Sequence, residues 1–161
     1  AQKLSEQKLP CDVIQPLSKG RWSPKALDEL IELMIQKHAI DQDRIYILGS
    51  SMGGAGTWEY GFKGKHDIAA FVPIASGASK TDKVHDRWDI TQMKDKPIWM
   101  FHGEDDTVVP FANALETANM MKAINPKFKW TTFPGVKHGS RAPALKTDAL
   151  YAWMLKQSCG E

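Results

Sequence analysis

The sequence is poor in cysteine and has no long apolar run, and these two shortages already exclude several classes of protein. Its 161 residues include two cysteines, Cys11 and Cys159, which lie near opposite ends of the chain. Their spacing matches no CxxC metal or redox motif, so they are either unrelated thiols or a disulfide within or between chains. A disulfide would imply an oxidising compartment, which favours a secreted or periplasmic protein over a cytoplasmic one. The longest apolar runs reach only about five residues, far short of a membrane span.

Excess charge of one sign is also missing. The 21 basic and 19 acidic residues are interspersed and give a formal net charge of +2. Nucleic-acid binding requires a basic patch, which this sequence lacks. The chain opens on Ala1 without a signal-peptide pattern, as expected of a mature product or a fragment. We therefore expect a soluble protein that binds neither nucleic acid nor membrane.

Short apolar runs alternate with stretches of helical periodicity, which is typical of a parallel sheet covered by helices. The predicted fold class is α/β, with a mostly parallel sheet of about five strands and helices on both faces, in one domain spanning residues 1–161. Pro73 is expected near the end of its strand, because proline cannot donate to a ladder. The expected strands are 13–15, 45–48, 69–75, 98–101 and 128–133. The expected helices follow Ser23, run from Met52 to about Lys63, begin at Phe111, and lie over 145–153.

The letters GSSMG at residues 49–53 fit G-x-S-x-G, the nucleophile elbow. In this motif a strand turns into a helix within very few residues, which forces the serine at the tip into a strained backbone conformation. Both glycines are expected to be necessary, because a side chain at either position would clash with the neighbouring elements. The pattern indicates that Ser51 is the exposed serine and Ser50 a spacer. A strand before the motif and a helix after it are the context that the motif requires.

A serine hydroxyl needs a base, usually histidine, and the base needs an orienting carboxylate. Sites in parallel sheets form beyond the carboxyl ends of the strands, so both partners are expected just after later strands. The fourth expected strand is followed by HGEDDTVVP, whose acids are Glu104, Asp105 and Asp106. The last expected strand is followed by PGVKHGS, which contains His138. The order serine, acid, histidine is typical of α/β hydrolases.

Four stretches make the chain resemble the α/β-hydrolase superfamily: DQDRIYILGSSMGGAGTW, AAFVPIASG, PIWMFHGEDDTVVP and FPGVKHGS. More narrowly, the chain is similar to compact serine esterases, such as polyhydroxybutyrate-depolymerase-like enzymes, feruloyl or acetyl-xylan esterases and dienelactone-hydrolase relatives. Matched residue by residue, the pattern H-G-x-x-D-x-x-V-P of this group implies that Asp106 is the catalytic acid. His138 matches the base of the family. His102 is then expected to buttress the acid loop and not to act as the base.

The resemblance implies a two-step acyl transfer by Ser51, His138 and Asp106, in which an acyl-enzyme forms and water then cleaves it. The backbone N–H of Met52 is expected to donate to the developing oxyanion. The candidate for the substrate pocket is Trp88, with burial in the core as its alternative interpretation. No cofactor is expected, because the glycine cluster does not fit G-x-G-x-x-G. No metal is expected either, because the acidic run that ends at Asp106 has no further ligands at fixed spacing.

The resemblance is incomplete at the N-terminal end. Members of this group usually carry several strands and a helix before the stretch that resembles residues 12–16. The chain is therefore expected to be a truncated core with an exposed edge beside the nucleophile strand. The second oxyanion donor normally comes from the loop after the third strand, a segment not found in this sequence. Three hypotheses stay open: the chain is a fragment, the strand at Val13 moves into the vacant position so that backbone near Pro16 donates, or two chains complete one another as a dimer.

The leading hypothesis for function is a carboxylic-ester hydrolase with a small-molecule or polymer-derived ester as substrate. A peptidase is the second hypothesis, because the catalytic domain of prolyl oligopeptidases shares this half of the fold. The third is a non-catalytic binding module, which the missing oxyanion segment keeps open. Acyl length and alcohol type do not follow from the sequence.

Overall fold

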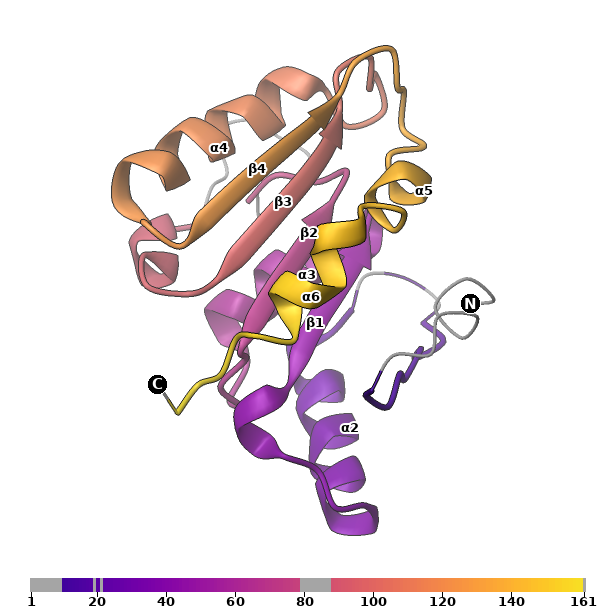
Figure 1. Ribbon diagram of the computed structural model, residues 1–161, viewed down its shortest axis with the longest axis vertical. Helices are drawn as coiled ribbons and strands as arrows, with labels where there is room; N and C mark the ends of the chain where they lie inside the picture. The colour runs from indigo at the N-terminus through magenta and orange to yellow at the C-terminus, as the bar shows by residue number, and fades with distance from the viewer. Residues whose placement is uncertain (1–9, 19, 21, 79–87, 161) are drawn as a thin grey trace.

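Four parallel strands form one sheet, and helices cover both of its faces (Figure 1). The computed structural model describes residues 10–18, 20, 22–78 and 88–160. The strands follow one another across the sheet in chain order. They are β1 (Tyr46–Ser50), β2 (Ala70–Ile74), β3 (Ile98–Gly103) and β4 (Phe128–Phe133). The helices are α2 (Pro24–Lys37), α3 (Met52–Lys63), α4 (Phe111–Ile124), α5 (Arg141–Ala144) and α6 (Asp148–Met154), with short 3₁₀ turns η1 (Gln42–Arg44) and η2 (Ile90–Met93).

The sheet separates two apolar clusters, because successive side chains of a strand point to opposite faces. On one face, Phe71 and Met100 pack in a cluster with side chains of α2, α3 and α4. On the other face, Val72 and Phe101 pack in a cluster with side chains of α5 and α6. The predicted α/β class, with a parallel sheet and helices on both faces, is confirmed.

The parallel registers bring the carboxyl ends of the strands to one edge of the sheet. Ser50 at the end of β1 pairs with Ile74 at the end of β2, and Ile74 pairs with Phe101 in β3. Gly103 at the end of β3 pairs with Phe133 at the end of β4. The turns that follow β1, β3 and β4 therefore lie at the same edge, where sites form in open parallel sheets.

The predicted helices are present with nearly the expected bounds. α2 begins after Ser23, whose hydroxyl accepts a hydrogen bond from the amide of Ala26 at 3.4 Å and caps the helix. α3 spans Met52–Lys63, as predicted, and α4 ends at Ile124, before Asn125 and Pro126. The expectation of one final helix over 145–153 is refined, because that segment follows a short turn of helix, α5, and forms α6 from Asp148.

The sheet has four strands and not about five, because the expected strand at 13–15 does not form. Residues 12–18 carry no secondary structure, and the side chains of Val13 and Ile14 are each 45% exposed. The apolar run is only two residues long and is followed by Gln15 and Pro16, so it buries too little surface to hold a strand. The hypothesis that this segment moves into the position beside β1 is therefore wrong, and in the part of the chain that the structure describes β1 is an edge strand.

Pro73 lies next to the last residue of β2, as predicted, although β2 is a central strand. The amides of Phe71 and Ala75, two residues to either side, donate at 2.9 Å to the carbonyl groups of Pro97 and Phe101. Because backbone groups of a strand alternate between its two neighbours, Pro73 stands where an N–H would face β3. The ladder between β2 and β3 thus omits one bond and continues beyond it.

A buried carboxylate joins α2 to the end of α3. Asp28 is only 3% exposed, and its Oδ1 accepts hydrogen bonds from the Tyr60 hydroxyl at 2.7 Å and from the Lys65 amide at 3.0 Å. Burial, followed by the hydrogen bond to Asp28, raises the pKa of Tyr60 far above its ordinary value, so the phenol remains a donor. This link fixes α2 against the helix that carries the site.

Replacement of Tyr60 by Phe will lower the free energy of unfolding by about 1–3 kcal/mol, because Asp28 loses a donor while it remains buried. Urea denaturation monitored by circular dichroism measures the change. The control is Lys25→Ala, because the Lys25–Glu29 pair has side chains 86% and 65% exposed. Its loss is expected to change stability by less than about 1 kcal/mol. Equal effects of the two substitutions would contradict a structural role for the Asp28–Tyr60 bond.

Candidate active site

Ser51 occupies a sharp turn between β1 and α3. Its backbone has φ 56° and ψ −116°, a region that residues with a side chain rarely adopt. The amide of Ser51 donates to the carbonyl of Ile74 at the end of β2 (2.9 Å), so the turn is tied to the neighbouring strand. Ser51 precedes the first residue of α3, but its hydroxyl makes no capping hydrogen bond and is free to face other partners.

Glycine is required at two positions around this turn, Gly49 and Gly54. The motif predicted Gly49 and Gly53, so one position of the pair differs. A Cβ on Gly49 would overlap the carbonyl of Gly53, so glycine is required there. A Cβ on Gly54 would lie 2.6 Å from the carbonyl oxygen of Ile74. A Cβ on Gly53 would only touch the indole of Trp22 at 3.5 Å, an ordinary contact. The expectation that Gly53 avoids a clash is therefore wrong, and Gly54 has that role.

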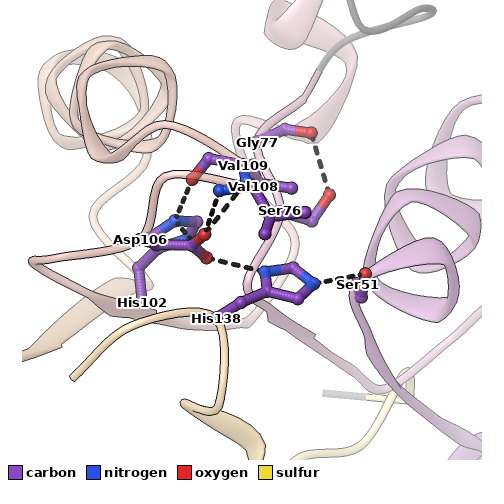
Figure 2. A network of polar contacts seen from close by, with 8 residues as sticks. All are labelled: Ser51, Ser76, Gly77, His102, Asp106, Val108, Val109 and His138. Atoms are coloured by element: carbon purple, nitrogen blue, oxygen red, sulfur yellow. Dashed lines mark hydrogen bonds and ion pairs between the residues drawn. The ribbon is translucent and has the colours of Figure 1, made fainter.

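The structure brings Ser51, His138 and Asp106 together in one chain of hydrogen bonds (Figure 2). Ser51 Oγ lies 2.8 Å from His138 Nε2, and His138 Nδ1 lies 2.9 Å from Asp106 Oδ2. The three side chains come from the turns after β1, β4 and β3, which share one edge of the sheet (Figure 1). Nδ1 carries the proton toward the carboxylate, and Nε2 then accepts from the serine hydroxyl.

Asp106 is held from several sides. The residue is 4% exposed, and its Oδ1 accepts from the amides of Val108 and Val109 at 2.9 and 3.0 Å. Its Oδ2 faces His138, and the Nε2 atom of His102 lies 3.3 Å from the same oxygen (Figure 2). The other two acids after β3 are placed differently: Glu104 and Asp105 are exposed.

Trp88 does not lie at this site. Its ring stacks on Phe62 with a centroid separation of 5.2 Å, and the Lys63 ammonium lies 4.7 Å from the indole centroid. These partners are the last residues of α3, roughly 16 Å along the helix from Ser51 at a rise of about 1.5 Å per residue. Trp88 thus lies toward the end of α3 opposite Ser51, and its part in a substrate pocket stays a prediction.

Trp22 is an aromatic residue that packs on α3 near the turn at Ser51, and the sequence analysis did not select it. A Cβ on Gly56 would lie 2.8 Å from the Cβ of Trp22, and the indole continues toward Gly53. Glycines three residues apart on α3 were the available signal for a flat side chain packed across the helix. Trp22 lines two hollows of about 660 and 110 Å³, the smaller also lined by Leu17, Leu27 and side chains near them.

The described part of the chain shows neither a metal-binding cluster nor a membrane-spanning helix. Within residues 10–18, 20, 22–78 and 88–160, no group of three or more His, Cys, Asp or Glu side chains is placed to hold a metal ion. The helices in the same ranges are all too short or too polar to cross a membrane. Cys11 and Cys159 are both free thiols.

A family model described as phospholipase/carboxylesterase matches residues 21–147. The chain belongs to this family of α/β hydrolases. The match includes every strand of the sheet and the turns that carry Ser51, Asp106 and His138. Membership favours ester hydrolysis over the peptidase hypothesis, because the family description names enzymes of carboxylic esters.

Curated relatives include two acyl-protein thioesterases. The chain is 28% identical to acyl-protein thioesterase 1 of Gibberella zeae over 138 residues, and this aligned region covers 85% of this chain and 57% of the relative. It is 40% identical to acyl-protein thioesterase 1 homolog 2 of Dictyostelium discoideum over 87 residues, and this region covers 54% of this chain and 38% of the relative. The chain thus spans about half the length of the curated relatives that it matches.

Solved structures share the same architecture. A thermostable esterase matches with a TM-score of 0.73 at 32% identity, over 83% of this chain and 36% of the other. Arabidopsis thaliana SOBER1 matches with a TM-score of 0.62 at 20% identity, over 81% of this chain and 60% of the other. The second likeness shows the fold alone.

Alanine substitution at the adjacent positions Gly53 and Gly54 will have opposite outcomes. Gly54→Ala will lower the free energy of unfolding by about 1–3 kcal/mol, because its Cβ must displace the backbone of Ile74. Gly53→Ala will leave stability unchanged or raise it by up to about 1 kcal/mol, because alanine favours the helix. Chemical denaturation of both variants measures the difference, and a stability loss at Gly53 as large as at Gly54 would contradict the packing described here.

Proposed function

We propose that this chain is a serine hydrolase of carboxylic esters that acts through Ser51, His138 and Asp106. The observation that carries the proposal is the continuous chain of hydrogen bonds from the serine hydroxyl through the imidazole to a buried carboxylate. A serine used only to cap a helix would direct its hydroxyl to the backbone of that helix. Ser51 instead directs it to a histidine from a turn 87 residues later in the chain.

In the first step, Ser51 Oγ attacks the ester carbonyl while His138 Nε2 accepts the hydroxyl proton. The 2.8 Å separation of these two atoms suits that transfer. The imidazolium so formed keeps its Nδ1–H bond to Asp106, whose negative charge stabilises it. His138 then protonates the leaving alcohol, and the acyl group remains on Ser51. In the second step, water attacks the acyl-enzyme and the same histidine serves again as the base.

The tetrahedral intermediate carries a negative oxygen that needs donors. Met52 is the first residue of α3, so its backbone N–H has no partner within the helix and is proposed as one donor. The positive end of the helix dipole favours an anion at the same place.

Esters of oxygen and of sulfur are both proposed substrates. Two curated relatives are named acyl-protein thioesterases, and one similar solved structure is named a thermostable esterase. Both reactions transfer an acyl group to the serine and release an alcohol or a thiol, so the same three residues serve both. Hydrolysis of matched oxygen and thiol esters with the same acyl chain will measure the leaving-group preference, and a series of p-nitrophenyl esters of different acyl length will measure the acyl-group preference.

A second copy of this chain is proposed to pair with the open edge of β1 and so to complete the site. The carbonyl of Ile45 accepts a hydrogen bond from the amide of Ala69, and the amide of Ser51 donates to the carbonyl of Ile74. The N–H and C=O groups of the odd-numbered residues of this segment therefore point toward β2. By the alternation of parallel strands, Tyr46 and Leu48 direct their backbone groups away from β2, to the open edge. A segment paired there would lie beside Ser51, opposite β2, where a second oxyanion donor is needed.

Ser51→Ala will reduce hydrolysis of p-nitrophenyl esters by about 10⁴-fold or more, because no nucleophile remains. Fluorophosphonate probes will label the unmodified chain and not the variant. The matched control is Ser50→Ala, at the neighbouring position, which will keep both the activity and the labelling. Labelling of the Ser51→Ala variant, or its loss in Ser50→Ala, would contradict the assignment. A folded chain that is never labelled would favour a non-catalytic binding module.

If two copies complete one site, specific activity will rise with protein concentration in parallel with the dimer fraction. Sedimentation velocity and ester hydrolysis over the same concentrations, from nanomolar to micromolar, test this. A monomer at micromolar concentration with constant specific activity would overturn the second copy as partner.

A further inference from the structure

His102 is a buried histidine next to the acid, and the proposed mechanism does not use it. It is the penultimate residue of β3, with an exposed fraction of 0%. Its ring contacts Phe111 at the start of α4 and Trp130 in β4, with centroid separations of 6.2 and 6.4 Å. A histidine placed among aromatic rings without any polar partner would be a packing residue.

One ring nitrogen of His102 has two polar partners. Nε2 lies 2.9 Å from the carbonyl oxygen of Val109 and 3.3 Å from Oδ2 of Asp106 (Figure 2). A carbonyl and a carboxylate only accept hydrogen bonds, so the proton must be on Nε2. The Nε2–H therefore donates to the Val109 carbonyl in the loop after the acid, and the Asp106 carboxylate lies in close polar contact with the same nitrogen.

The surroundings of the other ring nitrogen, Nδ1, indicate that the imidazole of His102 is uncharged. Nδ1 is buried and has no hydrogen-bond partner among the described residues. A proton there would be a buried donor without an acceptor, which is costly. Burial also lowers the pKa of His102 from its ordinary value, against the opposing effects of the Val109 carbonyl and the Asp106 charge. His102 thus carries one proton, on Nε2, at neutral pH.

We propose that His102 is a positioning residue: as an uncharged donor to the Val109 carbonyl it holds the loop whose amides bind Asp106, and so keeps the carboxylate in the orientation needed by His138. The inference rests on the proposed function, since it assigns a role toward the base of that mechanism. With His102 in place, Oδ1 accepts two backbone amides, and Oδ2 faces two imidazole nitrogens, Nε2 of His102 and Nδ1 of His138. The carboxylate cannot rotate without the loss of several of these bonds.

The absence of a positive charge on His102 preserves the interaction between Asp106 and His138 in the proposed mechanism. The charge on Asp106 is needed to stabilise the imidazolium that His138 becomes when it takes the serine proton. A positively charged His102 at the same oxygen would compete for that charge and repel the imidazolium. A neutral N–H orients the carboxylate and leaves its charge to His138.

The kinetic test compares two substitutions. His102→Leu removes the donor and is expected to reduce kcat for ester hydrolysis by about 10²-fold with little change in KM, because the base is misplaced. His102→Gln keeps an N–H within reach of the Val109 carbonyl and is expected to restore kcat to within about tenfold of the unmodified chain. Trp130→Phe, which alters the packing on His102 without removing a hydrogen bond, is the control and should leave kcat and KM unchanged.

The second test does not depend on turnover. Histidine labelled with ¹⁵N reports the tautomer of each ring by NMR, and His102 is expected to carry its proton on Nε2 alone at pH 7. The Nδ1–H signal of His138 should shift or broaden in His102→Leu and recover in His102→Gln. A proton on Nδ1 of His102, or an unchanged His138 signal in folded His102→Leu, would overturn the proposal even if the chain hydrolyses no ester. Near-native kcat in folded His102→Leu, or equal losses in the Leu and Gln variants, would also overturn it.

Discussion

The site depends on the close contact between the turn at Ser51 and the end of β2. Ser51 adopts its rare backbone conformation while its amide bonds to Ile74, and Gly54 approaches the same carbonyl where a Cβ would not fit. This contact fixes the direction in which the serine hydroxyl leaves the sheet and the start of α3 beneath it. The strain at one residue is sustained because two elements on either side are held by sheet pairing and by burial.

From the Ser51 hydroxyl, a chain of hydrogen bonds continues through His138 to Asp106. His138 bridges the serine and Asp106, and the two carboxylate oxygens have different partners. Oδ1 is held by the backbone of the loop that follows it, and Oδ2 is shared by imidazole side chains. The acid is thus fixed by its own loop on one side and directs its charge to the base on the other.

The sheet explains the position of the proposed site. Parallel strands bring three turns from distant parts of the chain to one edge, so Ser51, Asp106 and His138 meet although they lie far apart in sequence. Among the described residues, β1 pairs with β2 and with no strand on its other side. The proposed mechanism needs donors for the negative oxygen, and the described residues beside Ser51 come from one side of β1.

Short-range signals in the sequence by themselves determined the fold class, the helices at Ser23, Met52 and Phe111, and the candidates Ser51 and His138. The choice of Asp106 among three neighbouring acids came from the resemblance to α/β hydrolases. Glycine and serine at fixed spacing predict a sharp turn, and apolar runs predict buried strands. Only the tertiary structure decided that Val13 begins no strand, that Trp88 lies at the far end of α3, and that Gly54 and not Gly53 makes the close approach. It also decided which nitrogen of His102 carries the proton. Each of these features depends on contacts between segments that lie far apart in the sequence. Composition and local spacing do not specify such contacts, because they form only when the chain has folded.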